Sequence, residues 1–206
     1  MQEESATPDG QARRSAATRA RLLAAAREIF AADGYQAAST PAIARAAGVS
    51  RGALYHQYDD KAALFRDVVA TMQAELAERI DAETRMLADD PMAALRTGTL
   101  AFLRAASAPD FARIVMIEGP AVLGRDDWSG IDRAAGTATL RDGLAAAMAA
   151  GRLAPLPLET LATVLSGAMN EAALLVATAP DPAAALAGAA TVLDAVLDGL
   201  ARPANR

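Results

Sequence analysis

The stretch STPAIARAAGVSRGALYHQY, residues 39–58, predicts two short helices joined by a three-residue turn. Thr40 is the expected N-cap of the first helix, and Pro41 suits its first position, where a missing N–H costs no hydrogen bond. In the turn, Gly48 can reverse the chain and Ser50 can cap the second helix. This pattern is typical of a helix-turn-helix, a unit that presents its second helix to the major groove of DNA.

The second helix, expected over residues 51–58, has the chemistry of a helix that reads bases. Leu54 would face the core, and the small residues Gly52 and Ala53 would let the backbone approach DNA closely. Arg51 can donate two parallel hydrogen bonds to guanine, which typically give about 1 to 3 kcal/mol of discrimination. Hydroxyl, imidazole and ammonium groups nearby suit phosphate contacts. The expected DNA-binding residues are Thr40, Ser50, Arg51, Gly52, Ala53, Tyr55, His56 and Lys61.

Helical periodicity continues on both sides of this unit. Apolar residues at helical spacing predict a helix over residues 18–33, which Gly34 would end, and a long helix over residues 61–87, which Asp59-Asp60 would cap. Capping residues or prolines mark further helix starts at Asp90-Pro91, near Pro109, at Asp126-Asp127, near Pro157 and at Asp181-Pro182. The sequence therefore predicts an all-α protein of about nine helices without strands.

Charge is distributed unevenly along the chain. The net charge is −5, but residues 11–66 carry nine Lys or Arg against four Asp or Glu, and residues 67–206 carry eleven against eighteen. A basic N-terminal part on an acidic body suits a protein that docks one end on an anionic polymer. Cysteine is absent, which excludes disulfides, thiolate nucleophiles and cysteine metal sites.

Four runs form a longer pattern: residues 30–35, Ile43-Ala44, residues 47–50, and Leu54-Tyr55 through Lys61 to Leu64. Together they resemble the signature of the tetracycline-repressor (TetR) family, over residues 18–65. The resemblance implies that the second and third helices bind DNA, and that the fourth joins them to a body that binds a ligand and dimerises.

The resemblance also implies a domain organisation. Residues 1–14 would form a flexible N-terminal tail, residues 15–60 the DNA-binding domain, and residues 61–206 the effector-binding and dimerisation domain. The function expected on this basis is that of a transcriptional regulator, a repressor released from its operator by a small-molecule effector. The sequence does not identify the effector.

Bulky side chains of the body are concentrated between residues 86 and 128. A hydrophobic core accounts for each of them singly, but as a group they would also line a small-molecule pocket. The expected pocket residues are Met86, Phe102, Phe111, Arg113, Met116 and Trp128. Gly119-Pro120 should kink the helix that contains it, which would supply a mobile element.

Two apolar stripes near the C-terminus also admit two interpretations, a protomer core or packing against a second copy as a four-helix bundle. The resemblance favours a homodimer. The expected interface residues are Leu161, Leu165, Ala168, Ala172, Leu193 and Leu197. Twofold symmetry would place the two reading helices about 34 to 36 Å apart and imply a palindromic operator in double-stranded DNA.

Two other classes of protein remain as alternatives, a helical enzyme and an adaptor that binds protein or membrane through amphipathic helices. No second histidine, nucleophile elbow, phosphate-binding loop or zinc spacing accompanies His56, so neither catalysis nor a cofactor or metal is expected. No apolar stretch is expected to reach the roughly 18 residues of a membrane span, and the N-terminus is unlike a signal peptide. We therefore expect a cytoplasmic protein without a membrane partner.

Overall fold

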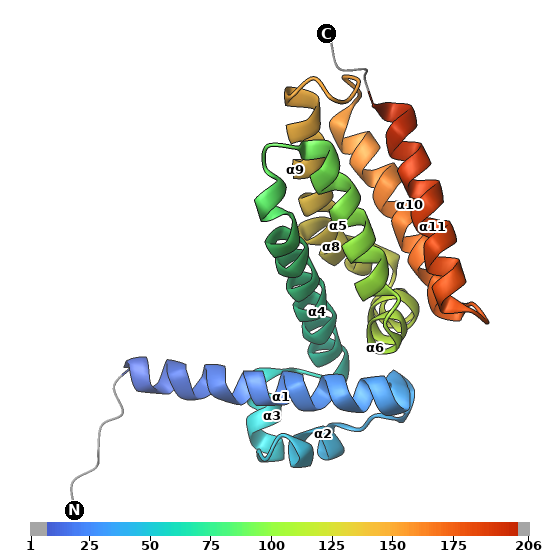
Figure 1. Cartoon of the computed structure of the whole chain (residues 1–206). Coiled ribbons are helices and arrows are strands. Elements are labelled where there is room, and N and C mark those ends of the chain that lie inside the picture. The colour runs from blue at the N-terminus through green and yellow to red at the C-terminus, as the bar shows by residue number, and fades with distance from the viewer. Residues whose placement is uncertain (1–7, 202–206) are drawn as a thin grey trace, which may run out of the picture. The chain divides into compact units, whose positions relative to one another are not determined.

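The computed structural model describes residues 8–201, which form an all-α protein (Figure 1). Within these residues the one extended pairing outside the helices is a bridge between Leu153 and Ala201. The chain divides into two compact units after Val69. The predicted fold class is confirmed, with a number of helices close to the nine expected.

The first unit contains α1 (Pro8–Ala37), α2 (Thr40–Ala46), α3 (Arg51–Gln57) and the start of α4 (Lys61–Thr84). The first helix begins at Pro8 instead of residue 18, so residues 8–14 of the expected tail are helical. Proline is tolerated in the first turn of a helix, and the alanines and arginines that follow favour helix. Gly34 interrupts α1 with a φ of 81°, where the sequence predicted its end.

Side-chain hydroxyls cap both short helices. Ser39 Oγ accepts the N–H of Ala42 at 3.3 Å, so Ser39 caps α2 and the prediction of Thr40 is wrong. Both residues are good caps, and the sequence pattern does not separate two such neighbours. Ser50 Oγ accepts the N–H of Ala53 at 3.1 Å, which confirms the predicted cap of α3.

Aromatic rings hold the start of α4 to α1. The centroid of the Phe65 ring lies 5.0 Å from those of both Phe30 and Tyr35. Leu64 and Phe65 are fully buried. Because these first turns of α4 complete the core of the first unit, the division comes after Val69 instead of after residue 60.

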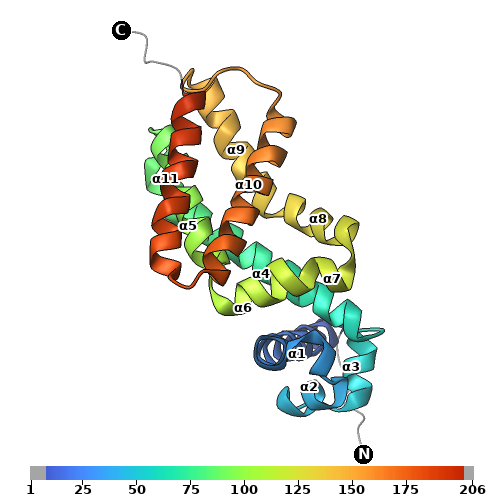
Figure 2. The same cartoon turned by 90° about the vertical axis from the view of Figure 1, so that its right-hand side faces the viewer.

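The second unit is a bundle of helices that pack against one another (Figure 2). After the remainder of α4 come η1 (Arg85–Leu87), α5 (Pro91–Ala106), α6 (Pro109–Phe111), η2 (Ala112–Glu118), α7 (Gly119–Leu123), α8 (Arg125–Ala134), α9 (Gly136–Ala149), α10 (Leu158–Thr178) and α11 (Pro182–Leu200). Helices α5, α9, α10 and α11 pack together, and their core includes Leu95, Leu144, Leu165 and Leu197.

Two helix boundaries in this unit differ from the prediction. Gly124, with a φ of 80°, precedes α8, so Asp126 and Asp127 lie in its first turn and do not cap it. The backbone breaks again at Ala135, where α9 begins as a separate helix. Neither break carries a capping hydroxyl or a proline, which are the signals that locate helix starts in a sequence.

The segment before Gly119-Pro120 is not a regular α-helix. Segment η2 is π-helical, a conformation in which the carbonyl of residue i accepts the N–H of residue i+5. The residue five positions after Val115 is Pro120, which has no N–H. The indole Nε1 of Trp128 donates to the Val115 carbonyl instead, at 2.7 Å. Trp128 thus supplies the hydrogen bond that the proline cannot.

Substituting alanine for Gly119 should lower the free energy of unfolding by about 1 to 3 kcal/mol. A Cβ at this position would lie 2.7 Å from Cδ1 of Trp128, which is too close for two carbon atoms. Urea unfolding measures the change. The matched control is Gly130→Ala in α8, where a Cβ meets nothing within 4 Å and alanine favours the helix. Equal stability of Gly119→Ala and the wild type would contradict this account of Trp128.

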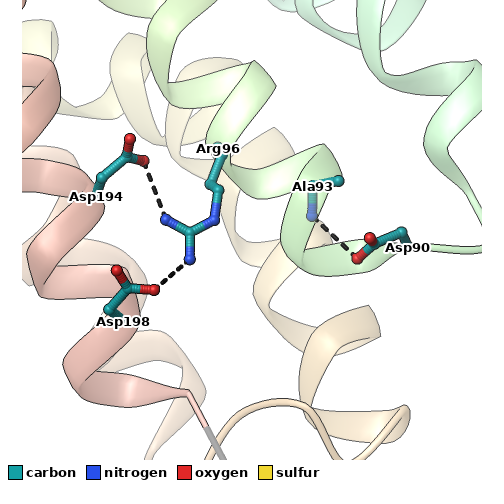
Figure 3. A network of polar contacts seen from close by, with 5 residues as sticks. All are labelled: Asp90, Ala93, Arg96, Asp194 and Asp198. Atoms are coloured by element: carbon teal, nitrogen blue, oxygen red, sulfur yellow. Dashed lines mark hydrogen bonds and ion pairs between the residues drawn. The ribbon is translucent and has the colours of Figure 1, made fainter.

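A polar network joins α5 to α11 at the surface (Figure 3). Arg96 Nη1 lies 3.3 Å from Asp194 Oδ1, and Arg96 Nη2 donates to Asp198. Asp90 accepts the N–H of Ala93 at 3.1 Å and so caps α5, as predicted. Since the carboxylates of the ion pairs are well exposed, each pair contributes at most about 1 kcal/mol. The network therefore adds little to the apolar packing that holds α11 against α5.

Candidate functional site

One side of α3 is exposed while the other is anchored in the core. Leu54 is fully buried, whereas Arg51, Gly52, Tyr55 and His56 are exposed. These four positions share one face, because residues four apart recur on the same side of a helix. The face therefore presents a guanidinium, a phenol and an imidazole to any partner that approaches α3.

The phenol of Tyr55 is held from the neighbouring helix. Its OH lies 3.1 Å from Thr40 Oγ1 on α2, and either atom can be the donor. This hydrogen bond with Thr40, followed by one with Arg51, lowers the pKa of Tyr55. Thr40 thus orients Tyr55 instead of capping α2. The structure brings together three of the predicted site residues on two helices.

The start of α3 leaves space beside its backbone. Gly48 adopts a φ of 64°, the left-handed conformation that its chain reversal requires. A Cβ on Gly52 would meet only Ser50 Oγ, at 3.8 Å. The N–H of Ala53 is already bonded to Ser50. Gly52 is therefore the position where another surface can come closest to this backbone, while Ser50 and Ala53 build the helix start.

Lys61 has a different role from the one the sequence indicated. Its Nζ donates to the carbonyl oxygens of Tyr35 at 2.8 Å and Ala38 at 3.0 Å, and it lies 4.2 Å from the centroid of the Tyr35 ring. An ammonium group has three N–H bonds, so most of its donor capacity is used inside the protein. Lys61 holds the start of α4 to the end of α1, and little remains for a phosphate.

A second network fixes the other end of α3. Arg19 on α1 donates to both carboxylate oxygens of Asp67 on α4, each at 2.8 Å. The OH of Tyr58, directly after α3, donates to Asp67 Oδ2 at 2.5 Å. Burial by itself would raise the pKa of Asp67, but the hydrogen bonds from Arg19 and Tyr58 outweigh it and lower that pKa. The sequence pattern does not predict this clamp, because its members lie far apart in the chain.

Replacing Asp67 with asparagine should lower the free energy of unfolding at neutral pH by about 1 kcal/mol, since Arg19 is largely exposed. The lowered pKa means that the ion pair stabilises the fold above the ordinary carboxylate value, near pH 4, and is lost as the pH falls through the folded value. Urea unfolding at a series of pH values should therefore show wild type and variant converging in acid.

The matched control for this prediction is Asp33→Asn. Asp33 is also an exposed acidic residue of the first unit, near the end of α1. Its substitution removes one carboxylate but leaves the pair of Arg19 and Asp67 in place, so the loss of stability that this pair causes in acid should remain. If the free energies of unfolding of Asp67→Asn and the wild type differed by the same amount at every pH, the proposed stabilisation by the Arg19–Asp67 pair would be contradicted.

The second unit contains a cavity of about 210 Å³. Helices α4, α5, α9 and α10 contribute its walls. The walls combine apolar side chains, among them Leu95, Phe102 and Met169, with polar ones, among them Asp81, Thr99 and Asp142. Its volume is below the roughly 300 to 1,000 Å³ of most ligand pockets, which suits a small molecule.

Six residues were predicted to line a pocket. Of these six, only Phe102 lines this cavity. The other five are Met86, Phe111, Arg113, Met116 and Trp128. Met86 is 90% exposed. Arg113 pairs with Glu118 at 3.5 Å within the π-helical segment. Most of the wall of this cavity consists of other residues, which were not singled out from the sequence.

A buried polar cluster in this unit was also missed. It contains Gln73 of α4, Asp132 of α8, Thr137 of α9 and Ser166 of α10, none more than 9% exposed. Gln73 Nε2 donates to Asp132 Oδ1 at 3.3 Å, and the hydroxyls of Thr137 and Ser166 lie 3.0 and 3.2 Å from Asp132 Oδ2. One signal was available in the sequence, since Gln73 comes four residues after Val69 and eight after Phe65, at the spacing of one apolar helix face.

The outer faces of α10 and α11 are apolar, and no other part of residues 8–201 covers them. Val164 and Val192 are each 62% exposed, and Leu175 is 57% exposed. Of the predicted interface residues, Leu165, Leu193 and Leu197 are buried within the protomer, Leu161 and Ala172 are half-buried, and Ala168 is exposed. The three buried leucines therefore cannot form an interface. They were predicted to do so because each helix has an inner and an outer apolar stripe, which the sequence pattern does not distinguish.

Helices α10 and α11 are also long and apolar enough to cross a membrane, judged by length and composition alone. The expectation that no stretch reaches this length is therefore wrong. Their hydropathy comes largely from alanine together with valine and leucine, and charged residues are few. Such uncovered apolar helices require an explanation, and packing against a second copy is the alternative to a lipid environment.

Two family models match the chain. The model described as bacterial regulatory proteins, tetR family, matches residues 22–68, which contain the exposed face of α3. The model described as tetracyclin repressor-like, C-terminal domain, matches residues 92–200, which cover most of the second unit. The two matches thus follow the same order along the chain as the two units.

Individual relatives agree with these matches. A crystal structure of a TetR-family transcriptional regulator from Pectobacterium atrosepticum is 32% identical, covers 92% of this chain and 97% of its own, and has a TM-score of 0.78. The regulator UidR of Escherichia coli K12 is 40% identical over 62 residues, which are 30% of this chain and 32% of UidR. The match thus spans about a third of the length of that curated relative.

A third similarity concerns the fold alone. The structure of RolR in complex with the ligand resorcinol is 20% identical, covers 95% of this chain and 98% of its own, and has a TM-score of 0.68.

Proposed function

The chain belongs to the tetR family of bacterial regulatory proteins, and we propose that it is a DNA-binding transcriptional regulator that acts as a repressor. The observation that carries the proposal is the exposed face of α3. That face combines Arg51, Tyr55 and His56 with a glycine beside which the backbone is open. Base recognition in the major groove requires such a combination of donors and close approach.

The roles of the individual residues follow from their contacts. Arg51 reads a base edge, and Tyr55, oriented by Thr40, contacts the phosphate backbone together with His56. Gly52 has no side chain and Ala53 has only a methyl group, so the helix backbone can approach the bases closely. Ser50 caps this helix. The surplus of positive charge in residues 11–66 attracts the phosphates, while the acidic remainder of the chain is repelled.

The regulator works as a homodimer on a palindromic operator. The uncovered apolar faces of α10 and α11 supply an interface that a second copy covers, with Val164, Ala168, Leu175, Val192 and Val196 on the outer side. Twofold symmetry then pairs the two reading helices with two half-sites. A dimer of this kind acts in the cytoplasm, without a membrane partner and without an enzymatic activity.

Release from the operator follows binding of a small effector in the second unit. The cavity of about 210 Å³ supports this part of the proposal, as does the ligand held by RolR, a protein of the same fold. Helix α4 borders the cavity through Ile80 and Thr84 and begins at Lys61 in the first unit. An effector that prefers one arrangement of the dimer can shift DNA affinity by about 1 to 3 kcal/mol.

Fluorescence anisotropy with the DNA upstream of the protein's own gene tests this function. Binding should be sequence-selective and should weaken steeply between low and physiological salt, as expected when several phosphates are neutralised. A scrambled duplex of equal length is the control. Equal, weak binding to both duplexes at both salt concentrations would contradict the proposed function.

A further inference from the structure

We propose that the effector of this regulator is a small organic cation, whose protonated amine is bound by Gln73 and Asp132 beside the cavity. The inference rests on the proposed effector-binding function and names the chemistry of the ligand.

The first observation is an unpaired acceptor. Gln73 is 1% exposed, and its Oε1 has no hydrogen-bond partner among residues 8–201, which the structure describes. The amide orientation is fixed, because its Nε2 donates to Asp132 Oδ1 at 3.3 Å, and a flipped amide would set two acceptor oxygens against each other. Buried polar groups in proteins are almost always paired, so Oε1 is a position that a donor from outside the chain can fill.

The second observation is a buried carboxylate without a cation. Asp132 is 7% exposed, and its hydrogen-bond partners are the amide of Gln73 and the hydroxyls of Thr137 and Ser166. Within the described part of the chain, no lysine, arginine or histidine lies within ion-pair distance of it. Buried charges are normally paired with an opposite charge, and a cationic ligand would provide one.

Gly136 connects this cluster with the cavity. The glycine lines the cavity wall, and a Cβ built on it would lie 3.5 Å from Asp132 Oδ1 and 3.7 Å from Gln73 Oε1. Leaving aside its neighbours Ala135 and Thr137 and the backbone of its own helix, no other atom of the described residues comes within 4 Å of that point. Neither Gln73 nor Asp132 lines the cavity itself, so a ligand group would reach the two oxygens past Gly136, the lining residue without a side chain.

The charge of the cavity wall also favours a cation. Asp81 and Asp142 line it, and among its described lining residues there is no lysine, arginine or histidine. Asp142 is paired with Arg141 at 2.7 Å, so Asp81 is the carboxylate that leaves the wall negative. The apolar side chains of Leu95, Phe102 and Met169 suit the hydrocarbon part of the ligand. An amine on a small aromatic or aliphatic body would match the buried acceptors, the negative charge of the wall and its apolar side chains.

Calorimetric titration of the full-length protein, without DNA, tests the inference with two probes of equal size, benzylamine and benzyl alcohol. Benzylamine is protonated at neutral pH and should bind at least about tenfold more tightly than the alcohol, since it forms a charge-assisted hydrogen bond. Asp132→Asn should remove this preference. Asp126→Asn, an exposed carboxylate on the same helix, is the matched control and should leave the preference intact.

Gly136→Ala keeps the inference testable if Asp132→Asn fails to fold. Its Cβ would make only ordinary contacts, so the protein should fold, but it would occupy the space between the two oxygens and weaken benzylamine binding by about tenfold. Because DNA is absent, these results are independent of operator binding. A protein that binds its operator but shows no binding of benzylamine at millimolar concentration, or equal affinity for both probes, would overturn the inference alone. Loss of operator binding with an intact amine preference would instead overturn the proposed regulatory function.

Discussion

The double substitution Val192→Asp and Val196→Asp should convert the dimer into a monomer and weaken operator binding by about 100-fold or more. Both valines lie on the outer face of α11 and are 62% and 41% exposed, so the substitutions do not disturb the protomer core. In the proposed dimer they would bury four carboxylates without partners, and each uncompensated buried charge costs several kcal/mol. A monomer presents one reading helix and loses the second half-site.

Sedimentation velocity and anisotropy with the same DNA measure both effects. The control is Ala146→Asp with Ala149→Asp, two exposed positions on α9 that carry the same added charge outside the proposed interface. This control should remain dimeric and retain most of its affinity. A Val192→Asp, Val196→Asp protein that still sediments as a dimer would show that these faces of α10 and α11 are covered by something else.

Replacing Arg51 with alanine should weaken binding to the operator by about 5- to 150-fold, which corresponds to the 1 to 3 kcal/mol of a bidentate contact with guanine. The loss should be confined to one base pair in each half-site, so that variants of the operator at that position are no longer distinguished. Arg51→Lys should not restore the discrimination, because an ammonium group cannot form the planar pair of hydrogen bonds. Anisotropy titrations against a set of singly substituted operators measure this.

The matched control for Arg51 is Arg79→Ala. Arg79 is an exposed arginine of α4 in the second unit, and its removal changes the net charge equally. Its effect should be small and the same for every operator variant. If Arg51→Ala and Arg79→Ala weakened binding equally, Arg51 would contribute only general electrostatic attraction, and base reading would belong to other residues.

The helix-turn-helix could be predicted because its signals are local. Gly48 and Ser50 act within a few residues of their own positions, and the structure bears out both the turn and the cap. The α2 cap was misplaced by one residue, since Ser39 and Thr40 are equivalent in pattern and differ only in where their side chains point. The break at Ala135 has only Gly136 as a local signal, and a single glycine inside a helical pattern does not by itself locate a break.

The parts of the site that depend on long-range packing were not predictable from the pattern. Lys61 was predicted to contact a phosphate because its ammonium group follows the second short helix. In the structure it donates to carbonyl oxygens of residues 23 and 26 positions earlier in the chain. Gln73 and Ser166 meet around Asp132 from helices far apart in the chain. Which stripe of α10 or α11 faces inward is decided by the neighbouring helices, so the sequence assigned Leu165 to the interface although it fills the core.

Selection of bound fragments from the genome, with the purified wild-type protein and with Arg51→Ala in parallel, tests the central claim most directly. The account predicts enrichment of a short inverted repeat whose half-sites are centred about 10 base pairs or a multiple of that apart. The Arg51→Ala protein should lose the preference at one position of each half-site. Recovery of fragments without a shared sequence, at equal yield for both proteins, would contradict the assignment of α3 as the DNA-reading helix.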